Sequence, residues 1–168
     1  VTLELGGRSP AIVSADVPLK DAAERIAFGK CLNAGQTCVA PDYVLVPEDR
    51  VEGFVEAYSN AVRGFYPTLA DNPDYTAIIN ERQQARLNAY VKDATDKGAT
   101  LIPLYDQGQA RRMAHSLLLN VSDEMTVMQD EIFGPVLPIV PYRGLDQAFA
   151  YINQRPRPLA LYLSLIHI

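Results

Sequence analysis

Short apolar runs alternate along this chain with longer segments in which apolar residues recur every three or four positions, and this alternation is the strongest constraint on the fold. The short runs have the length of buried strands, and the longer segments have the spacing of helices that bury one face. Strands are expected at residues 1–5, 11–13, 43–46, 100–104, 116–121, 136–140 and 159–163, and helices at 19–33, 51–65, 80–97 and 145–152. Strands that alternate with helices pair mainly in parallel. The sequence therefore predicts an α/β fold, with a mostly parallel sheet covered by helices.

Size and charge narrow the class of protein. The 168 residues are enough for one domain with a hydrophobic core, and no apolar run reaches the length of a membrane span. The net charge of −5, without a basic cluster, argues against nucleic acid as a partner. Two cysteines without a paired framework favour a reducing compartment, so we expect a cytoplasmic protein. No cluster of His, Cys, Asp or Glu has metal-ligand spacing, and we expect no metal site.

The segment NAGQTC at 33–38 places a thiol in a turn between a helical pattern and a strand. Gly35 and its small neighbours allow a backbone to approach a ligand closely and leave the sulfur of Cys38 accessible. Cys31 instead lies on the apolar face of the preceding helical pattern, where a free cysteine acts as a small buried hydrophobe. Cys38 is therefore the candidate nucleophile.

Two acidic motifs accompany this thiol. Glu4 ends the strand expected at 1–5 and precedes two glycines, a place where α/β folds often carry their chemistry. Glu131 and Phe133 lie in the turn EIFGP at 131–135. Taken alone, Glu4 is best interpreted as a solvated strand residue, Glu131 as a surface acid and Phe133 as a core ring. Near a cysteine nucleophile, however, a carboxylate could activate water.

Two further residues carry local predictions. Asp16, shortly before Pro18, is expected to cap the helix at 19–33. His115, beside the strand expected at 116–121, is interpreted as a surface histidine or one with satisfied hydrogen bonds, in preference to a ligand.

The three motifs LELGG at 3–7, NAGQTC at 33–38 and EIFGP at 131–135 resemble signature motifs of the NAD(P)-dependent aldehyde dehydrogenases, in the same order and with fitting spacing. The longer runs at 36–43 and 153–162 resemble the class 3 branch, which includes coniferyl and fatty aldehyde dehydrogenases. The resemblance covers roughly residues 1–163.

The resemblance implies a role for each site residue. Cys38 would be the nucleophile and Glu4 the base that activates water. Glu131 would bind the hydroxyls of the nicotinamide ribose, and Phe133 would pack near the nicotinamide ring. The backbone N–H of Cys38 would help to bind the alkoxide, together with an upstream asparagine outside this sequence. The cofactor would be NAD or NADP, and its phosphate-binding turn also lies outside this sequence.

The resemblance also implies domain limits. Residues 1–7 would end the coenzyme-binding domain, 8–163 would form a truncated catalytic domain, and 164–168 would be an artefactual tail, with a native extension of the strand as the alternative. We expect the fragment alone to be inactive and the complete protein to be a homo-oligomer. Its substrate would be a small-molecule aldehyde, either aromatic, such as coniferaldehyde, or a medium to long aliphatic one.

Two alternative functions stay open. A relative that transfers the acyl group to coenzyme A or reduces an acyl phosphate would share Cys38, although Glu4 favours release by water. A non-catalytic remnant of the fold would be expected to lack the nucleophile or the base, and the sequence retains both.

Overall fold

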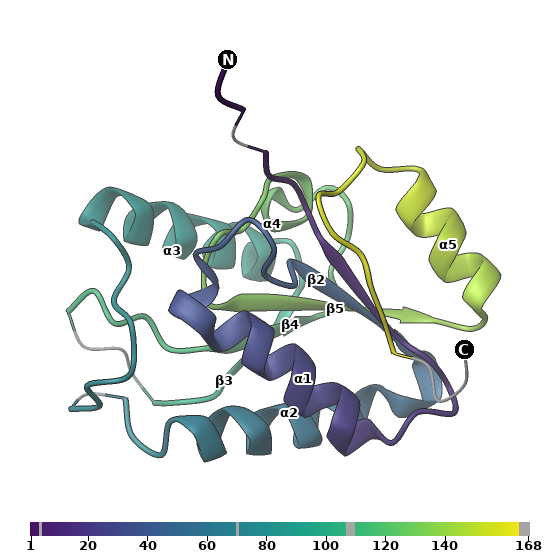
Figure 1. Cartoon of the computed structure of the whole chain (residues 1–168), viewed down its shortest axis with the longest axis horizontal. Helices are drawn as coiled ribbons and strands as arrows, with labels where there is room; N and C mark the ends of the chain where they lie inside the picture. Colours follow the sequence, from purple (N-terminus) through teal and green to yellow (C-terminus); the bar gives the residue numbers. More distant parts are fainter. Residues whose placement is uncertain (4, 70, 107–109, 165–168) are drawn as a thin grey trace.

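A six-stranded sheet forms the centre of the computed structural model, which describes residues 1–3, 5–69, 71–106 and 110–164. The strand order is β3-β4-β5-β2-β1-β6 (Figure 1). The strands are β1 (Pro10–Val13), β2 (Tyr43–Pro47), β3 (Thr100–Pro103), β4 (Ser116–Leu119), β5 (Val136–Tyr142) and β6 (Tyr162–Ser164). Every pairing is parallel except β3 with β4. The α/β class and the mostly parallel sheet are thus confirmed.

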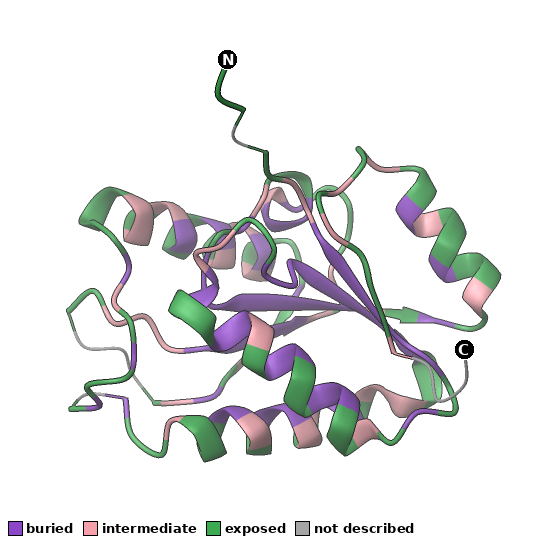
Figure 2. Ribbon diagram, viewed as in Figure 1, coloured by how far each residue is buried: buried purple, intermediate pink, exposed green. Residues whose placement is uncertain are grey.

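Helices cover both faces of this sheet (Figure 1). They are α1 (Leu19–Cys31), α2 (Val51–Phe65), α3 (Glu81–Asp96), α4 (Thr126–Gln129) and α5 (Leu145–Asn153), with short 3-10 turns at Leu32–Gly35 and Glu48–Arg50. Helices α1 and α2 pack on the face that carries Val13 and Val46, and α3, α4 and α5 pack on the face that carries Ile12 and Leu45. Successive strand residues point to opposite faces of the sheet, and helices cover both faces. Strands β1 and β2 are therefore buried along their whole length (Figure 2).

The expected strand at 1–5 is not formed by the residues described there, 1–3 and 5. A strand needs a neighbour for its backbone N–H and C=O groups, and β1 already pairs with β2 on one side and β6 on the other. The alternating pattern at the start of the chain is therefore insufficient by itself to make a strand.

The expected cap of the first helix is also wrong. Pro18 occupies the N-cap position of α1, without a side-chain cap, and Asp16 instead accepts a hydrogen bond from the Ser14 hydroxyl. Capping requires the side chain to stand at the N-cap position, and the helix begins too late for Asp16 to do so. In α3, by contrast, Asn80 is the N-cap and accepts the Gln83 N–H at 2.9 Å.

None of the helices formed by the described residues combines the length and apolar character needed to cross a membrane. The sequence also predicts a turn around residues 106–108, between β3 and β4, but 107 and 108 lie outside the described residues, as does most of the proposed tail, 165–168. Ser164 itself belongs to β6 and pairs with Val13.

Candidate active site

The candidate nucleophile lies on a loop that leaves α1 through an unusual backbone turn. Asn33, Ala34 and Gly35 have φ values of 51°, 53° and 74°, all in the left-handed region. Residues with a Cβ enter this region at a cost of about 1 kcal/mol each, so the surrounding contacts must hold them there. The turn carries the chain away from the helix axis, and Cys38 emerges on the surface with an exposed side chain.

Gln36 is one of the contacts that hold this loop. Its side-chain amide donates to the carbonyl of Asn33 at 3.0 Å and to that of Ala77 at 3.2 Å. Its side-chain oxygen accepts the N–H of Ile79 at 3.0 Å. Gln36 thereby fastens the cysteine loop to the segment that leads into α3, a role that the sequence analysis did not assign.

The two cysteines occupy opposite environments. Cys31 is buried at the end of α1, and burial raises the pKa of its thiol to about 12. This confirms that Cys31 is a buried hydrophobic residue. Cys38 is the exposed thiol, and it alone is available to a reactant from solution.

The EIFGP turn presents the other two predicted site residues. Phe133 adopts a left-handed backbone with φ 51°, and its side chain is 41% exposed. Glu131 is partly buried, and burial raises the pKa of its carboxyl, while a hydrogen bond from the backbone of Gly7 opposes that rise. A Cβ atom at Gly6 would lie 2.7 Å from a carboxylate oxygen of Glu131, so a glycine at position 6 leaves room for this side chain.

The structure brings parts of the three motifs together. Gly35 of the cysteine loop packs against the backbone of Gly134, and Gly6 and Gly7 lie against Glu131. Glu4, the predicted base, lies outside the described residues. The described parts therefore juxtapose an exposed thiol loop, a partly buried carboxylate and an exposed aromatic ring.

A buried ion pair beside these motifs was missed by the sequence analysis. The guanidinium of Arg8 donates to the carboxylate of Asp42 at 2.7 Å, and both side chains are largely shielded from solvent. The signal in the sequence was a single acidic residue placed between Pro41 and the apolar strand β2, where a buried charge requires a partner.

Two basic side chains, Lys30 and His115, are fully buried near the site, and the ammonium of Lys30 has no hydrogen-bond partner among the residues described. Burial lowers the pKa of the Lys30 ammonium to about 8, a fall that the Asp42 carboxylate opposes. Burial lowers the pKa of His115 to about 3, so its imidazole is neutral near pH 7. The interpretation of His115 as a surface histidine was wrong, because the residue is fully buried between the rings of Tyr58 and Tyr75.

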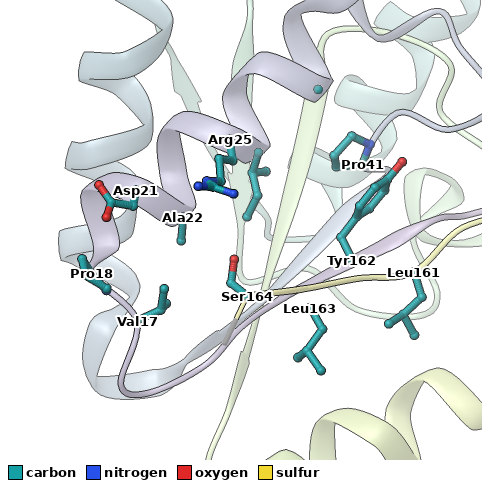
Figure 3. A pocket seen from close by; sticks show the side chains of 12 residues that line it. Val17, Pro18, Asp21, Ala22, Arg25, Pro41, Leu161, Tyr162, Leu163 and Ser164 are labelled. Carbon is teal, nitrogen blue, oxygen red and sulfur yellow. The ribbon is translucent and has the colours of Figure 1, made fainter. Parts of the chain in front are cut away.

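A groove between α1 and β6 lies away from these motifs. Figure 3 shows Asp21 and Arg25 of α1 on one side and Tyr162 and Ser164 of β6 on the other. Cys38, Glu131 and Phe133 do not line this groove, so we do not assign the site to it. Nor do the described side chains of His, Cys, Asp and Glu form any group of three that could hold a metal ion.

Comparison with known proteins places these motifs in a family. Residues 1–164 match the family model described as the aldehyde dehydrogenase family. A Pseudomonas aeruginosa protein named as a probable coniferyl aldehyde dehydrogenase is 72% identical over 162 residues, which make up 96% of this chain and 34% of that protein. The chain thus spans about a third of the length of this relative.

Solved structures agree with the fold. Staphylococcus aureus AldH in a substrate-bound state superposes with a TM-score of 0.88 and 41% identity, over 98% of this chain and 36% of that one. An NADP-dependent glyceraldehyde-3-phosphate dehydrogenase from Bacillus halodurans, complexed with NADP, superposes with a TM-score of 0.86 and 31% identity, over 98% of this chain and 34% of that one.

Proposed function

The chain belongs to the aldehyde dehydrogenase family, and on that premise we propose that the complete protein oxidises an aldehyde to a carboxylic acid with NAD or NADP. The observation that carries the proposal is the contact of the cysteine loop with the EIFGP turn, through Gly35 and Gly134, beside an exposed Cys38. A nucleophile and the side chains proposed to bind coenzyme are thereby held on adjoining loops.

Cys38 begins the proposed reaction as a thiolate. Its sulfur adds to the aldehyde carbon, a carbon–sulfur bond forms, and the carbonyl oxygen becomes an alkoxide. The backbone N–H of Cys38 is proposed to donate to this alkoxide, as donors of an oxyanion hole do. The exposed position of Cys38 allows the aldehyde to reach the sulfur without a rearrangement of the core.

Glu131 and Phe133 have the chemistry needed to hold the nicotinamide–ribose end of the coenzyme. The carboxylate of Glu131 has two oxygen acceptors, which suit a pair of ribose hydroxyls, and it is only partly buried. The exposed ring of Phe133 offers a flat apolar surface beside it. When bound, the coenzyme supplies the acceptor for the hydride that leaves the substrate carbon.

Loss of that hydride leaves a thioester on Cys38, and water must release the acid. We propose that Glu4 takes a proton from this water while the water oxygen adds to the thioester carbon. The carbon–sulfur bond then breaks, the acid leaves, and the thiolate of Cys38 is restored. The role of Glu4 rests on the LELGG resemblance.

Coniferyl aldehyde is the substrate that we propose to test first, because the 72% identical relative is named for it. Complete protein should show a higher kcat/KM for coniferyl aldehyde than for octanal, with NAD and NADP assayed separately. The opposite order would favour an aliphatic substrate. The complete protein is also proposed to be a homo-oligomer, which sedimentation measures directly.

The test of the chemistry uses the complete protein with three substitutions. Cys38→Ala should abolish coenzyme reduction, because the bond-forming atom is lost. Glu4→Gln should allow one equivalent of coenzyme to be reduced and then turn over about 100-fold or more slowly, because the thioester persists. Cys31→Ala, in the core, serves as the matched control and should stay close to wild type.

Activity that survives Cys38→Ala would overturn the proposed mechanism, and normal turnover by Glu4→Gln would favour the acyl-transfer alternative. Residues 1–168 alone are proposed to be inactive, since the phosphate-binding turn is not among them. Oxidation of benzaldehyde by the purified fragment would contradict that view.

A further inference from the structure

We propose that Asp42 is a positioning residue, which fixes the turn carrying Glu131 and Phe133 relative to the Cys38 loop, with Arg8 as its counter-ion. The catalytic consequence of this inference rests on the proposed function, whereas the hydrogen bonds that Asp42 makes to Arg8 and Ile132 are present in the structure. Asp42 follows the cysteine loop and directly precedes β2, a central strand of the sheet. It is therefore anchored to the most rigid part of the fold.

One buried carboxylate joins three segments of the chain. A carboxylate oxygen of Asp42 accepts the backbone N–H of Ile132 at 2.9 Å, and the other accepts the Nε–H of Arg8 at 2.7 Å. The backbone N–H of Asp42 donates to the carbonyl of Ser9 at 2.7 Å. Because the side chain of Asp42 is only 4% exposed, water competes little with Arg8 and Ile132 for its carboxylate oxygens.

The hydrogen bond between Asp42 and Ile132 holds a turn that contains a strained residue, Phe133. Ile132 donates its N–H to Asp42, and its carbonyl accepts a hydrogen bond from the guanidinium of Arg86 at 2.7 Å. The peptide units on both sides of Ile132 are thus held just before Phe133, whose left-handed φ of 51° is unfavourable for an aromatic residue. Loss of the bond to Asp42 would let this backbone relax toward an ordinary conformation and would move the Phe133 ring.

Arg8 makes the buried charge of Asp42 tolerable. Its guanidinium also donates to the carbonyl of Met128, and it lies 5.0 Å above the centre of the Tyr43 ring. A charge-assisted bond in a shielded place is strong and directional. The ion pair between Arg143 and Glu48 has a similar distance of 2.9 Å but lies in solvent, with side chains 80% and 52% exposed. That pair is the matched control, since exposed pairs contribute little.

The catalytic consequence follows from the position of Ile132, whose N–H is bound by Asp42. Ile132 lies between Glu131 and Phe133, the residues proposed to hold the coenzyme, whereas Cys38 lies on the other loop. Loosening of Ile132 should therefore weaken coenzyme binding more than it slows the chemistry at sulfur. A merely structural loss would instead lower stability and leave the coenzyme KM unchanged.

The experiment uses the complete protein with Asp42→Ala, Asp42→Asn, Arg8→Gln and the control Glu48→Gln. Hydrogen exchange in the segment 129–135 should be about tenfold faster in Asp42→Ala, because the Ile132 amide loses its acceptor. Asp42→Asn should show a smaller increase, because its amide oxygen can still accept that bond. The coenzyme KM should rise about fivefold or more in Asp42→Ala, with kcat changed by less than about twofold.

The double substitution Asp42→Asn with Arg8→Gln should raise the coenzyme KM no more than the more harmful of the two single substitutions does. Each single change already removes the same ion pair. Unchanged exchange at 129–135 in both Asp42 variants, or an unchanged coenzyme KM in folded active variants, would overturn the positioning role. If the wild-type protein fails to oxidise aldehydes, the proposed function falls, while the exchange measurement still decides whether Asp42 holds the turn.

Discussion

The backbone of Gly35 packs directly against the carbonyl of Gly134, and this contact joins the cysteine loop to the EIFGP turn. A Cβ atom at Gly35 would overlap that carbonyl, and the φ of 74° there already disfavours any residue with a side chain. Position 35 therefore requires glycine for two independent reasons, one local and one tertiary.

Gly35→Ala should accordingly destabilise the protein by about 2 kcal/mol or more, from backbone strain and overpacking together. Gly64→Ala is the matched control, since Gly64 lies in α2 with no atom near its missing Cβ. That change should stabilise the protein by roughly 0.5–1 kcal/mol, because alanine favours the helix. Urea unfolding curves of the two variants measure both effects, and equal shifts would contradict the contact.

Alkylation should distinguish the two thiols. At neutral pH, iodoacetamide should modify Cys38 in the folded protein and leave Cys31 intact, because Cys31 is buried and its pKa is raised to about 12. Mass spectrometry should find a single adduct in the native protein and a second one only in denaturant. Cys38→Ser should remove the native adduct, and rapid labelling of Cys31 in the folded protein would contradict the structure.

Lys30 should make stability depend on alkaline pH. Its pKa falls from 10.5 in the unfolded chain to about 8 in the fold, so the unfolded chain binds the proton more tightly. The contribution of Lys30 to stability is therefore most favourable above pH 10.5, falls by about 3 kcal/mol as the pH drops toward 8, and stays low below 8.

Lys30→Met should remove this cost, because methionine fills the same space without a buried charge. The variant should exceed wild type by about 1–3 kcal/mol at pH 7, with the gap narrowing between pH 8 and 10.5. Lys92→Met, at an exposed position of α3, is the control and should change little. A gap that does not vary with pH would mean that Lys30 does not titrate in this range.

His115 should make the fold sensitive to acid. Its pKa is 6.5 in the unfolded chain and about 3 in the fold, so stability falls as the pH drops from 6.5 toward 3. The full effect is on the order of 5 kcal/mol. His115→Phe should flatten the fall in unfolding free energy between these pH values, as measured by urea titrations. An unchanged slope would assign acid sensitivity to the carboxylates instead.

Several features were predictable from the sequence because each depends on local pattern. The apolar runs of β1, β2 and β5 and the helical spacing of α1 to α3 were found within a few residues of their observed limits. The resemblance to aldehyde dehydrogenases was confirmed by the family match over residues 1–164. The roles of Cys38, Glu4, Glu131 and Phe133 remain predictions that the proposed experiments test.

Apart from the local error over the cap of α1, the errors arose where a residue's partner is distant in the chain. The segment 1–5 has a strand pattern, but pairing decides whether a strand forms. His115 follows no helical or strand pattern that would reveal its burial between Tyr58 and Tyr75.

The sequence by itself determined the order of the elements and the identity of the exposed and buried cysteines, because these follow from local pattern along a short stretch, and its three motifs carried the resemblance to the family. Only the tertiary structure decided that Gly35 contacts Gly134, that Arg8 and Asp42 pair beside Ile132, and that Lys30 is enclosed without a partner. Each of these relationships joins segments that are far apart in the chain or depends on what surrounds a side chain. Their free energies depend on distance and desolvation, which exist only once the sheet and its helices have assembled.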